Sequence, residues 1–233
     1  MAADRGAIVL ADGAVPARDV LDGAWPGWSA GIELVVAADG GARHAAPLLL
    51  PIDIWVGDGD SIEPELLARL EAQGVEIRRV PVDKDETDAE LALRTALDAG
   101  AGRVVILGGL GGPRLDHALA NLGLLEHPAL GGGGGGAARE AIAYDERATR
   151  ISVLDGPGAR DLTGREGDVV SLLALGGPAR GVTTTSLRYP LDGEDLERGR
   201  TRGISNVRTA SVARVRLESG RLLVIETPVT VGR

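Results

Sequence analysis

The sequence of 233 residues contains no cysteine and no phenylalanine. Without cysteine, neither disulfide bonds nor thiolate metal sites can form, which fits a reducing compartment. Three tryptophans and two tyrosines are the only aromatic residues, so the core has to be aliphatic. No apolar run approaches the roughly 20 residues that a membrane-spanning helix needs. The hydrophobic content of 44% and charged content of 25% are typical of a globular protein with one or two domains.

Basic residues are fewer than acidic ones, with 25 lysines and arginines against 34 aspartates and glutamates. The net charge of −9 at pH 7 argues against nucleic-acid binding, which usually needs a basic surface. An acidic protein that binds a polyanion such as ATP needs metal ions or local arginines to offset the repulsion. The first residues, Met1 to Gly6, lack the basic and apolar segments of a secretory signal. We therefore expect a cytoplasmic protein with no nucleic-acid or membrane partner.

Lysine is the rarest basic residue, because Lys84 stands alone among 24 arginines. It lies within the acidic stretch Asp83-Lys84-Asp85-Glu86-Thr87-Asp88. An ammonium group is a compact point charge that can reach a phosphate oxygen, whereas a guanidinium group is a wide, planar fork. The pattern therefore favours phosphate chemistry, and the alternative is a solvated run of surface charges.

Short apolar runs alternate with helical patterns in the first part of the chain. Expected strands cover residues 7–10, 33–38, 52–56, 75–80 and 103–107, and expected helices cover 64–73, 88–99 and 115–126. Continuous aliphatic runs separated by helices predict a parallel sheet that is covered on both faces. Ligands bind such sheets at the carboxyl ends of the strands, where glycine and polar residues gather in this sequence.

The pattern changes to strands alone in the last third of the chain. Expected strands cover residues 150–154, 168–175, 179–184, 211–217 and 222–226, and residues 193–199 hint at a helix. We expect the glycine run Gly131–Gly136 to form a loop. The predicted fold is an N-terminal parallel-sheet α/β domain, residues 1–148, followed by a C-terminal all-β domain, residues 149–233.

Paired aspartates follow the third expected strand, in Gly57-Asp58-Gly59-Asp60-Ser61. Alternate residues of an extended segment point the same way, so Asp58 and Asp60 can share one cation. Asp88 would supply a third carboxylate and complete a Mg²⁺ site. For Asp85, a place at the start of a helix is as good an explanation as a catalytic role. A charged turn that precedes a helix is the structural alternative, and it explains Ser61 better than it explains the paired aspartates.

A second candidate site begins at Gly108-Gly109-Leu110-Gly111-Gly112, directly after the fifth expected strand. Glycines there would let backbone N–H groups surround a phosphate, and Arg114 could bind one with two hydrogen bonds. The stretch matches neither the P-loop nor the dinucleotide-binding pattern. His117 is more often a core or capping residue at such a position than a catalytic one.

Several motifs, taken in order, resemble those of the thiamine pyrophosphokinase family. In the α/β half they are Ala38-Asp39-Gly40-Gly41-Ala42, Gly57-Asp58-Gly59-Asp60-Ser61, Lys84-Asp85-Glu86-Thr87-Asp88 and Arg114-Leu115-Asp116-His117. In the β half they are Ser171-Leu172-Leu173-Ala174-Leu175, Gly181-Val182-Thr183-Thr184, Leu187-Arg188-Tyr189-Pro190-Leu191 and Arg202-Gly203-Ile204-Ser205-Asn206. The resemblance spans about residues 35 to 226.

The resemblance implies an N-terminal α/β nucleotide domain that binds ATP and Mg²⁺, and a C-terminal β-sandwich domain that binds thiamine. It also implies a homodimer with sites between subunits and a kinase reaction that forms thiamine diphosphate. Pyrophosphate passes from ATP to the thiamine hydroxyl, AMP leaves, and Mg²⁺ is required. By resemblance, the Mg²⁺ ligands are Asp58, Asp60 and Asp88. The phosphate-side residues are Lys84, Arg114 and Asp116, and Asp85 or Asp116 would orient the hydroxyl or accept its proton. ATP is expected near Asp39, Gly40, Gly41, Thr87, Gly108 and Gly109, and thiamine near Ser205 and Asn206.

The sequence departs from the family pattern at two places. Pro113 precedes Arg114, where the family usually has two glycines. Thr185-Ser186 stands where the family commonly has Glu-Gly. Because the second change lies near the presumed acceptor end, a diphosphokinase for another hydroxymethyl heterocycle, such as a pterin, is a rival function. A non-catalytic thiamine or nucleotide sensor is a second rival, but binding alone would need fewer carboxylates. A glycosyltransferase that uses Asp58 and Asp60 is a third, and it would leave the β domain unexplained.

Overall fold

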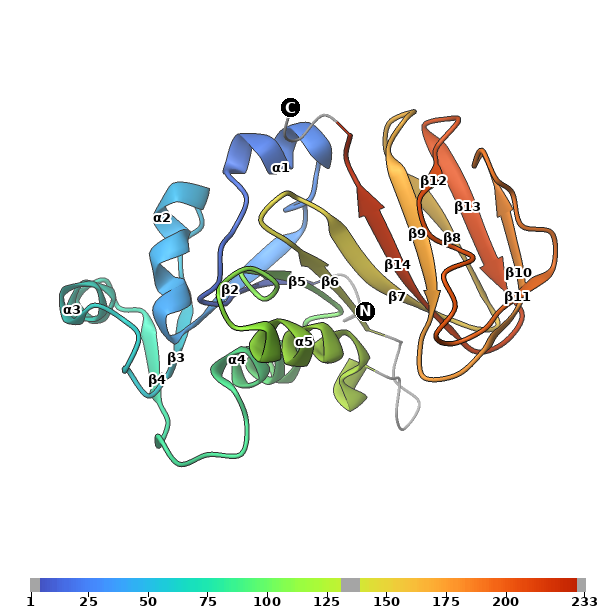
Figure 1. Ribbon diagram of the computed structural model, residues 1–233. Helices are drawn as coiled ribbons and strands as arrows, with labels where there is room; N and C mark the ends of the chain where they lie inside the picture. The colour runs from blue at the N-terminus through green and yellow to red at the C-terminus, as the bar shows by residue number, and fades with distance from the viewer. Residues whose placement is uncertain (1–4, 131–138, 230–233) are drawn as a thin grey trace. The chain divides into compact units, whose positions relative to one another are not determined.

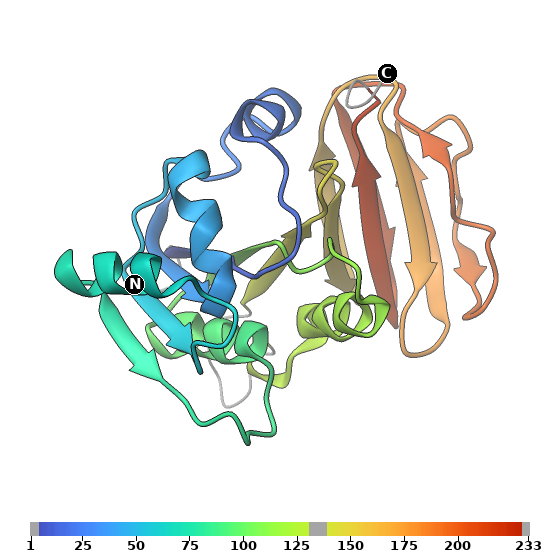
Figure 2. The same ribbon diagram turned by 60° about the vertical axis from the view of Figure 1, so that its left-hand side comes forward.

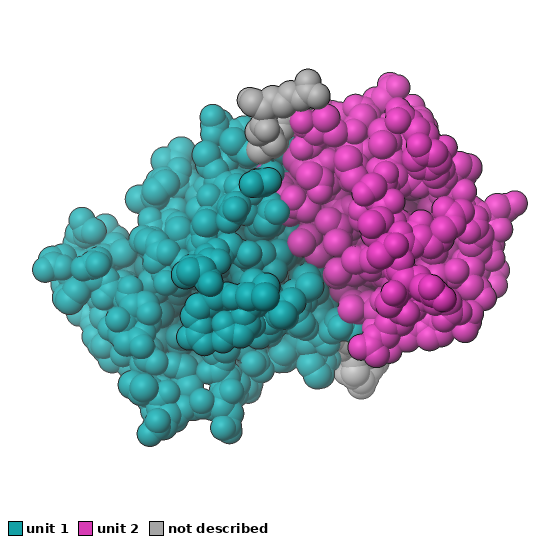
Figure 3. Space-filling model, in the orientation of Figure 1, with its two compact units in different colours: residues 1–147 teal, residues 148–233 magenta. Residues whose placement is uncertain are grey.

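The computed structural model describes residues 5–130 and 139–229. The chain divides into two compact units, residues 1–147 and 148–233, which are coloured separately in Figure 3. The expected loop Gly131–Gly136 lies outside the described residues. In the described part of the chain, no helix is long and apolar enough to cross a membrane.

Unit 1 is built on a parallel sheet whose strands lie in the order β6-β5-β1-β2-β3-β4. The strands are β1 (Gly6–Leu10), β2 (Ile32–Ala38), β3 (Ile54–Gly57), β4 (Glu76–Arg79), β5 (Arg103–Leu107) and β6 (Glu140–Tyr144). Every residue of β1 is buried, as expected for a central strand covered on both faces. The predicted parallel α/β architecture is confirmed.

Helices cover both faces of this sheet. The α-helices are α1 (Arg18–Ala24), α2 (Ala45–Leu48), α3 (Pro64–Ala72), α4 (Asp88–Asp98) and α5 (Leu115–Gly123). Short 3₁₀ helices are η1 (Asp39–His44), η2 (Leu124–Glu126) and η3 (Pro128–Leu130). Helices α1 and α2 lie on one face and α4 on the other (Figures 1 and 2). The side chains of Ala92, Leu93 and Ala96 on α4 are buried, and this helix packs against β1 and β2.

Unit 2 consists of two antiparallel sheets, with strand orders β12-β9-β14-β7 and β11-β10-β13-β8. The strands are β7 (Arg150–Asp155), β8 (Gly158–Thr163), β9 (Val169–Ala174), β10 (Ala179–Thr185), β11 (Glu194–Leu196), β12 (Asn206–Val207), β13 (Val212–Leu217) and β14 (Arg221–Thr227). Aliphatic residues from both sheets, such as Val170, Val182 and Val224, form one buried cluster. The predicted β domain is confirmed.

The helix expected at residues 193–199 is wrong. Glu194–Leu196 forms strand β11, which pairs antiparallel with β10 through Val182 and Glu194. Gly193 and Gly199 both have positive φ, at 68° and 77°. They leave five residues between them, too few for a stable helical nucleus, so pairing with β10 prevails. Helices α1, α2, η1 and η3 and strands β6, β8 and β12 were not predicted.

Candidate active site

A cavity of about 400 Å³ opens at the carboxyl ends of β1, β2 and β5. Asp12 and Gly13 follow β1, Asp39 follows β2, and Gly108 and Gly109 follow β5, and all of them line this cavity. The first turns of α4 and α5 complete the wall. This edge of a parallel sheet is where α/β proteins bind ligands, because strand ends and helix N-termini converge there.

Asp39 is the deepest carboxylate of the cavity, with 3% of its surface exposed. Its backbone has φ = 43°, and its main-chain oxygen accepts a hydrogen bond of 3.0 Å from the indole nitrogen of Trp55. A Cβ atom at Gly57 would lie 2.8 Å from the Cβ of Asp39, so glycine is required there. The local packing therefore fixes Asp39 in a conformation that an L-residue seldom adopts.

Burial raises the pKa of Asp39 to about 6. The nearby carboxylates of Asp60, Asp88 and Asp58 act in the same direction, whereas the backbone N–H of Ser61, 3.1 Å from Oδ2, lowers the pKa. The other oxygen, Oδ1, is buried without a hydrogen-bond partner. A buried carboxylate oxygen without a partner is costly, and a bound cation would remove that cost.

Asp39, Asp58 and Asp60 form a group in which one carboxylate oxygen of each lies within 4.8 Å of the others. The segment from Asp58 to Asp60 is a tight turn rather than the extended segment predicted. Gly59 has φ = 88°, and Asp58 Oδ1 accepts a hydrogen bond of 3.1 Å from the Asp60 amide. Oxygen ligands of this kind, together with the partnerless oxygen of Asp39, fit a divalent cation such as Mg²⁺.

Lys84 links the acidic turn that contains Asp58 to the start of α4, where Asp88 lies. Its Nζ atom is 2.7 Å from Asp58 Oδ2 and 3.0 Å from Asp88 Oδ1, and its side chain is 13% exposed. Burial acts to lower the pKa of Lys84, but the hydrogen bonds and charges of Asp58 and Asp88 outweigh it and raise the pKa. Asp88 is therefore held by this ammonium group and stands outside the group of three carboxylates, in which Asp39 takes part instead.

The residues around the start of α4 have different roles. Thr87 caps the helix, because its Oγ1 accepts a hydrogen bond of 3.2 Å from the Glu90 amide, and it also lines the cavity. Asp88 is the first residue of the helix and lines the cavity too. Asp85 is exposed in the preceding turn. The structure thus brings Lys84, Thr87 and Asp88 to the site and leaves Asp85 at its surface.

The glycines of the site are needed for close packing between strand ends. Gly108 has φ = 73°, and a Cβ atom there would lie 2.2 Å from the main-chain oxygen of Ala11. A Cβ atom at Gly41 would lie 2.1 Å from Leu10 O. Gly109 lines the cavity, and its carbonyl accepts a hydrogen bond of 2.9 Å from the side chain of Asn121. Gly40 and Gly41 allow η1 to approach β1, whereas Gly108 and Gly109 face the cavity.

Arg114 binds Asp116 through two hydrogen bonds at the start of α5, with Nε 3.2 Å from Oδ1. Both side chains are about two-thirds exposed, at 65% and 64%. The guanidinium group lowers the pKa of Asp116 to about 2. Pro113, Arg114 and His117 all line the cavity. The arginine therefore stands at the cavity mouth despite the proline before it.

Ser205 and Asn206 belong to unit 2. Ser205 has φ = 58°, and its amide donates to Ser171 Oγ over 3.0 Å. The side-chain amide of Asn206 donates to the main-chain oxygen of Tyr189 over 2.6 Å and accepts from the Tyr189 N–H over 2.9 Å. Asn206 therefore fixes the backbone at Tyr189. Ser186 has φ = 57°, which explains why a glycine suits this position in the family pattern.

Among the polar side chains that line the cavity, those of Asp12 and Asn121 were not predicted. Asp12 lines it and forms an ion pair with Arg43, and Asn121 anchors the glycine-rich turn. Asp12 had one sequence signal, since Asp12-Gly13 directly follows a strand and so lies at the ligand-binding edge. Nothing in the sequence pattern distinguished Asn121 from other polar helix residues.

Two protein-family models match the chain. "Thiamin pyrophosphokinase, catalytic domain" matches residues 28–130, and "Thiamin pyrophosphokinase, vitamin B1 binding domain" matches residues 159–222. Together the two matches cover more than two thirds of the 233 residues, one in each unit.

Named relatives agree with these matches. Thiamine pyrophosphokinase 1 from Oryza sativa subsp. japonica is 28% identical, over 80% of this chain and 76% of its own length. Thiamine pyrophosphokinase from Bacillus subtilis (strain 168) is 28% identical, over 77% of this chain and 79% of its own. A crystal structure of thiamine pyrophosphokinase from Bacillus subtilis has the same fold, with a TM-score of 0.78, 24% identity, and coverage of 96% and 99% of the two chains. The chain belongs to the thiamin pyrophosphokinase family.

Proposed function

We propose that this protein transfers pyrophosphate from ATP to the hydroxyl group of thiamine and forms thiamine diphosphate and AMP. The observation that carries the proposal is the convergence, in and around one cavity, of three acidic residues with Lys84, a glycine-rich turn and Arg114. The two named relatives are thiamine pyrophosphokinases, which supports the same reaction. Transfer of a phosphoryl-type group depends mainly on positioning and electrostatics, which this arrangement of residues can supply.

Mg²⁺ is the proposed metal ion. Asp58 and Asp60 would hold it, with Asp39 as the buried third ligand and with Asp88 nearby. When bound, the ion would offset negative charge on the phosphate oxygens of ATP. The chain needs this help because its net charge is −9 and ATP is itself an anion.

The cationic side chains of the site would act on the phosphates. Lys84 and Arg114 would stabilise the negative charge that grows during transfer. Gly108 and Gly109, on the strand-end turn, would let the nucleotide approach the backbone. Asp116, with a pKa of about 2, is too weak a base to take a proton at neutral pH, so we propose that it orients Arg114. Asp85 is the proposed partner of the thiamine hydroxyl.

The acceptor would bind through Ser205 and Asn206 of unit 2. Support comes from the match of residues 159–222 to the vitamin B1 binding domain. We further propose that the protein works as a cytoplasmic homodimer with its sites between subunits. Light scattering coupled to size-exclusion chromatography tests the dimer, and a monomeric mass with full activity would refute this arrangement.

One assay tests the proposed reaction. Purified protein is incubated with Mg-ATP and thiamine, and the nucleotide products are separated by chromatography. We expect AMP and thiamine diphosphate in equal amounts, and Asp58→Asn as the control should give neither. ADP in place of AMP would refute pyrophosphate transfer, and thiamine binding without turnover would favour a sensor. Hydroxymethyl pterin in a parallel reaction tests the rival acceptor that Thr185 and Ser186 bring into question.

A further inference from the structure

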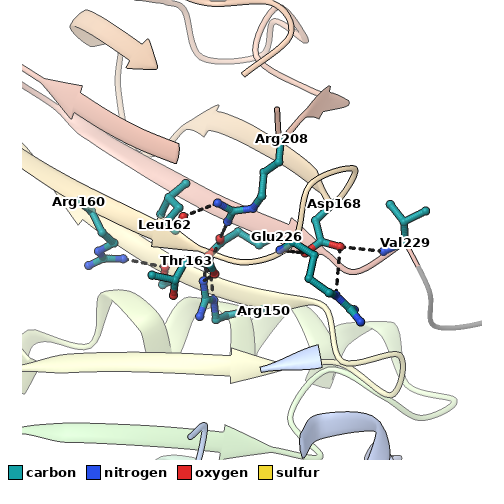
Figure 4. A network of polar contacts seen from close by, with 10 residues as sticks. Arg150, Arg160, Leu162, Thr163, Asp168, Arg208, Glu226 and Val229 are labelled. Atoms are coloured by element: carbon teal, nitrogen blue, oxygen red, sulfur yellow. Dashed lines mark hydrogen bonds and ion pairs between the residues drawn. The ribbon is translucent and has the colours of Figure 1, made fainter. Parts of the chain in front are cut away.

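Unit 2 contains an arginine that is almost completely buried. Arg208 is 1% exposed, and Figure 4 shows its guanidinium group between the main-chain oxygen of Leu162 and the carboxylate of Glu226, with a hydrogen bond to each. Glu226 is 2% exposed and is also bound by Arg150, whose Nε and Nη2 atoms lie 2.8 Å and 2.9 Å from its two oxygens. One buried carboxylate is therefore shared by two arginines.

The main chain of Arg208 is held as firmly as its side chain. Its amide donates to Asp168 O over 2.9 Å, and its carbonyl accepts from Gly167 N over 3.0 Å. The carboxylate of Asp168 is itself buried and accepts a hydrogen bond from Val229 N over 3.2 Å (Figure 4). A Cβ atom at Gly164 would lie 2.8 Å from Arg208 Nε, so the neighbouring turn is shaped around the guanidinium group.

Stability alone does not account for such a buried arginine. Removing two charges from water costs several kcal/mol for each ion, and apolar residues of similar size often stabilise a core equally well. A guanidinium group that binds two fixed acceptors, however, defines the position of its own backbone closely, because its hydrogen bonds are directional. The surroundings of Arg208 should therefore reveal what is being positioned.

The backbone next to Arg208 carries the residues expected to bind the acceptor. Asn206, two residues earlier, holds both main-chain polar groups of Tyr189 with its side chain. Val207 O accepts a hydrogen bond of 2.9 Å from Arg188 N, and Arg208 forms an isolated β-bridge with Leu187. Any displacement of Arg208 would move residues 187–189 together with 205–207.

We propose that Arg208 is a positioning residue for the acceptor substrate. Through its contacts with Glu226 and Leu162 it fixes β12, and through β12 it fixes Ser205, Asn206 and the backbone of Tyr189. It acts through these neighbours and needs no contact with the substrate. The proposal rests on the proposed function, because it assumes that thiamine binds at Ser205 and Asn206.

The test compares two arginines that share one carboxylate. Arg208→Met removes the guanidinium group and keeps most of its bulk, while Glu226 remains bound to Arg150. Arg150→Met removes the other arginine from the same carboxylate but lies in β7, away from Asn206. We expect Arg208→Met to raise the KM for thiamine about tenfold, which corresponds to a loss of about 1.4 kcal/mol of binding free energy, with kcat and the KM for ATP changed little. Arg150→Met should lower the unfolding temperature and leave the KM for thiamine unchanged.

Hydrogen exchange supplies a readout that does not depend on turnover. The Tyr189 amide donates to Asn206 Oδ1, so we expect it to exchange faster in Arg208→Met than in Arg150→Met. An unchanged KM for thiamine together with unchanged exchange at Tyr189 would overturn the proposal and leave Arg208 a structural residue. An equal increase in KM in both variants would overturn it as well, because general loosening of the unit would then be the cause.

A conservative variant keeps the test decisive if Arg208→Met does not fold. Arg208→Lys retains the charge and can reach only one of the two acceptors, so we expect a smaller increase in the KM for thiamine and a smaller increase in Tyr189 exchange. Wild-type values for both in this variant would refute a positioning role for the guanidinium group. If the wild-type protein forms no AMP, the proposed function fails, while the exchange rate of Tyr189 still tests the anchoring of the loop by Arg208.

Discussion

Lys84 Nζ lies 2.7 Å from Asp58 Oδ2, so the only lysine of the chain binds one of the carboxylates expected to hold Mg²⁺. Its second partner is Asp88, at the first turn of α4. The ammonium group acts as an internal counter-ion for the acidic cluster. A divalent cation that uses Asp58 must compete with Lys84, and a phosphate group that draws Lys84 away would strengthen the binding of that cation.

Lys84→Met should therefore change metal affinity and turnover in opposite directions. Without the ammonium group, Asp58 gains freedom to bind a cation, so we expect Mn²⁺ to bind more tightly in the absence of nucleotide, measured by electron paramagnetic resonance. Turnover should fall by at least about a hundredfold, as when one group that stabilises a transition state is removed. Lys84→Arg should keep the fold and still lose much of the rate, because its planar fork is not a compact point charge.

Arg78→Met is the matched control for Lys84→Met. It removes one positive charge from unit 1 at an exposed ion pair with Glu76, outside the residues that line the cavity. Mn²⁺ affinity and turnover should both remain near wild type, since exposed ion pairs contribute about 0–1 kcal/mol. If Lys84→Arg turned over at the wild-type rate, Lys84 would only balance the charge of the neighbouring carboxylates and would have no specific role in transfer.

Asp58→Asn and Asp88→Asn should both fold normally and lose activity. Neither side chain is part of an apolar core, so loss of a charge there opens no cavity. We expect each variant to lose several kcal/mol of transition-state stabilisation, the order expected when the charge of a metal ion is misplaced. Asp58→Asn should weaken Mn²⁺ binding more than Asp88→Asn, because Asp58 belongs to the group of three carboxylates and Asp88 does not. Near-wild-type turnover in either variant would place the metal elsewhere.

Asp39 should make the stability of unit 1 fall as pH rises. Its pKa is about 6 in the folded protein and 3.8 in an ordinary environment, so ionisation costs more in the folded state than in the unfolded state. The stability present below about pH 4 is therefore lost as pH increases through about 6, by at most about 3 kcal/mol. Urea unfolding in the presence of a chelator should show this loss in the wild type and much less of it in Asp39→Asn.

Magnesium provides the complementary measurement on Asp39. Added Mg²⁺ should stabilise the wild-type protein more above pH 6 than below it, because only the ionised carboxylate attracts the cation. Added Mg²⁺ should increase the stability of Asp39→Asn less than that of the wild-type protein. Equal stabilisation of both proteins at neutral pH would exclude Asp39 from the cation site.

The fold was predictable where burial determines composition. Strands such as β1 and β5 are covered on both faces and are therefore continuous aliphatic runs. Strand β6 escaped prediction because two of its five residues are alanine, which is uncommon in strands, and β8 because its residues are mostly polar or half-buried. Pairing with neighbouring strands, rather than local preference, makes both segments extended.

The sequence predicted those site residues that lie just after strands of the parallel sheet or at the start of the following helices. Asp58, Asp88 and Lys84 converge because parallel strands end at one edge, which the order of elements implies. The place of Asp39 in the acidic group was not predicted, because it depends on a positive φ and on the close approach of Gly57. The contacts of Asn206 with Tyr189 likewise depend on tertiary packing that no local pattern records.

Gly108 offers a test of how tightly the cavity wall is packed. It has φ = 73°, and a methyl group there would lie 2.2 Å from the main-chain oxygen of Ala11, which cannot move without disturbing β1. Gly31 is the matched control, because it has φ = 71° and open space around its Cβ position. Gly31→Ala should cost about 1–2 kcal/mol of unfolding free energy from the backbone conformation alone. Gly108→Ala should cost at least about 1–3 kcal/mol more from the clash, and should raise the KM for ATP. Urea unfolding of both variants measures the difference, and equal costs would mean that the end of β5 can move away from β1 without strain.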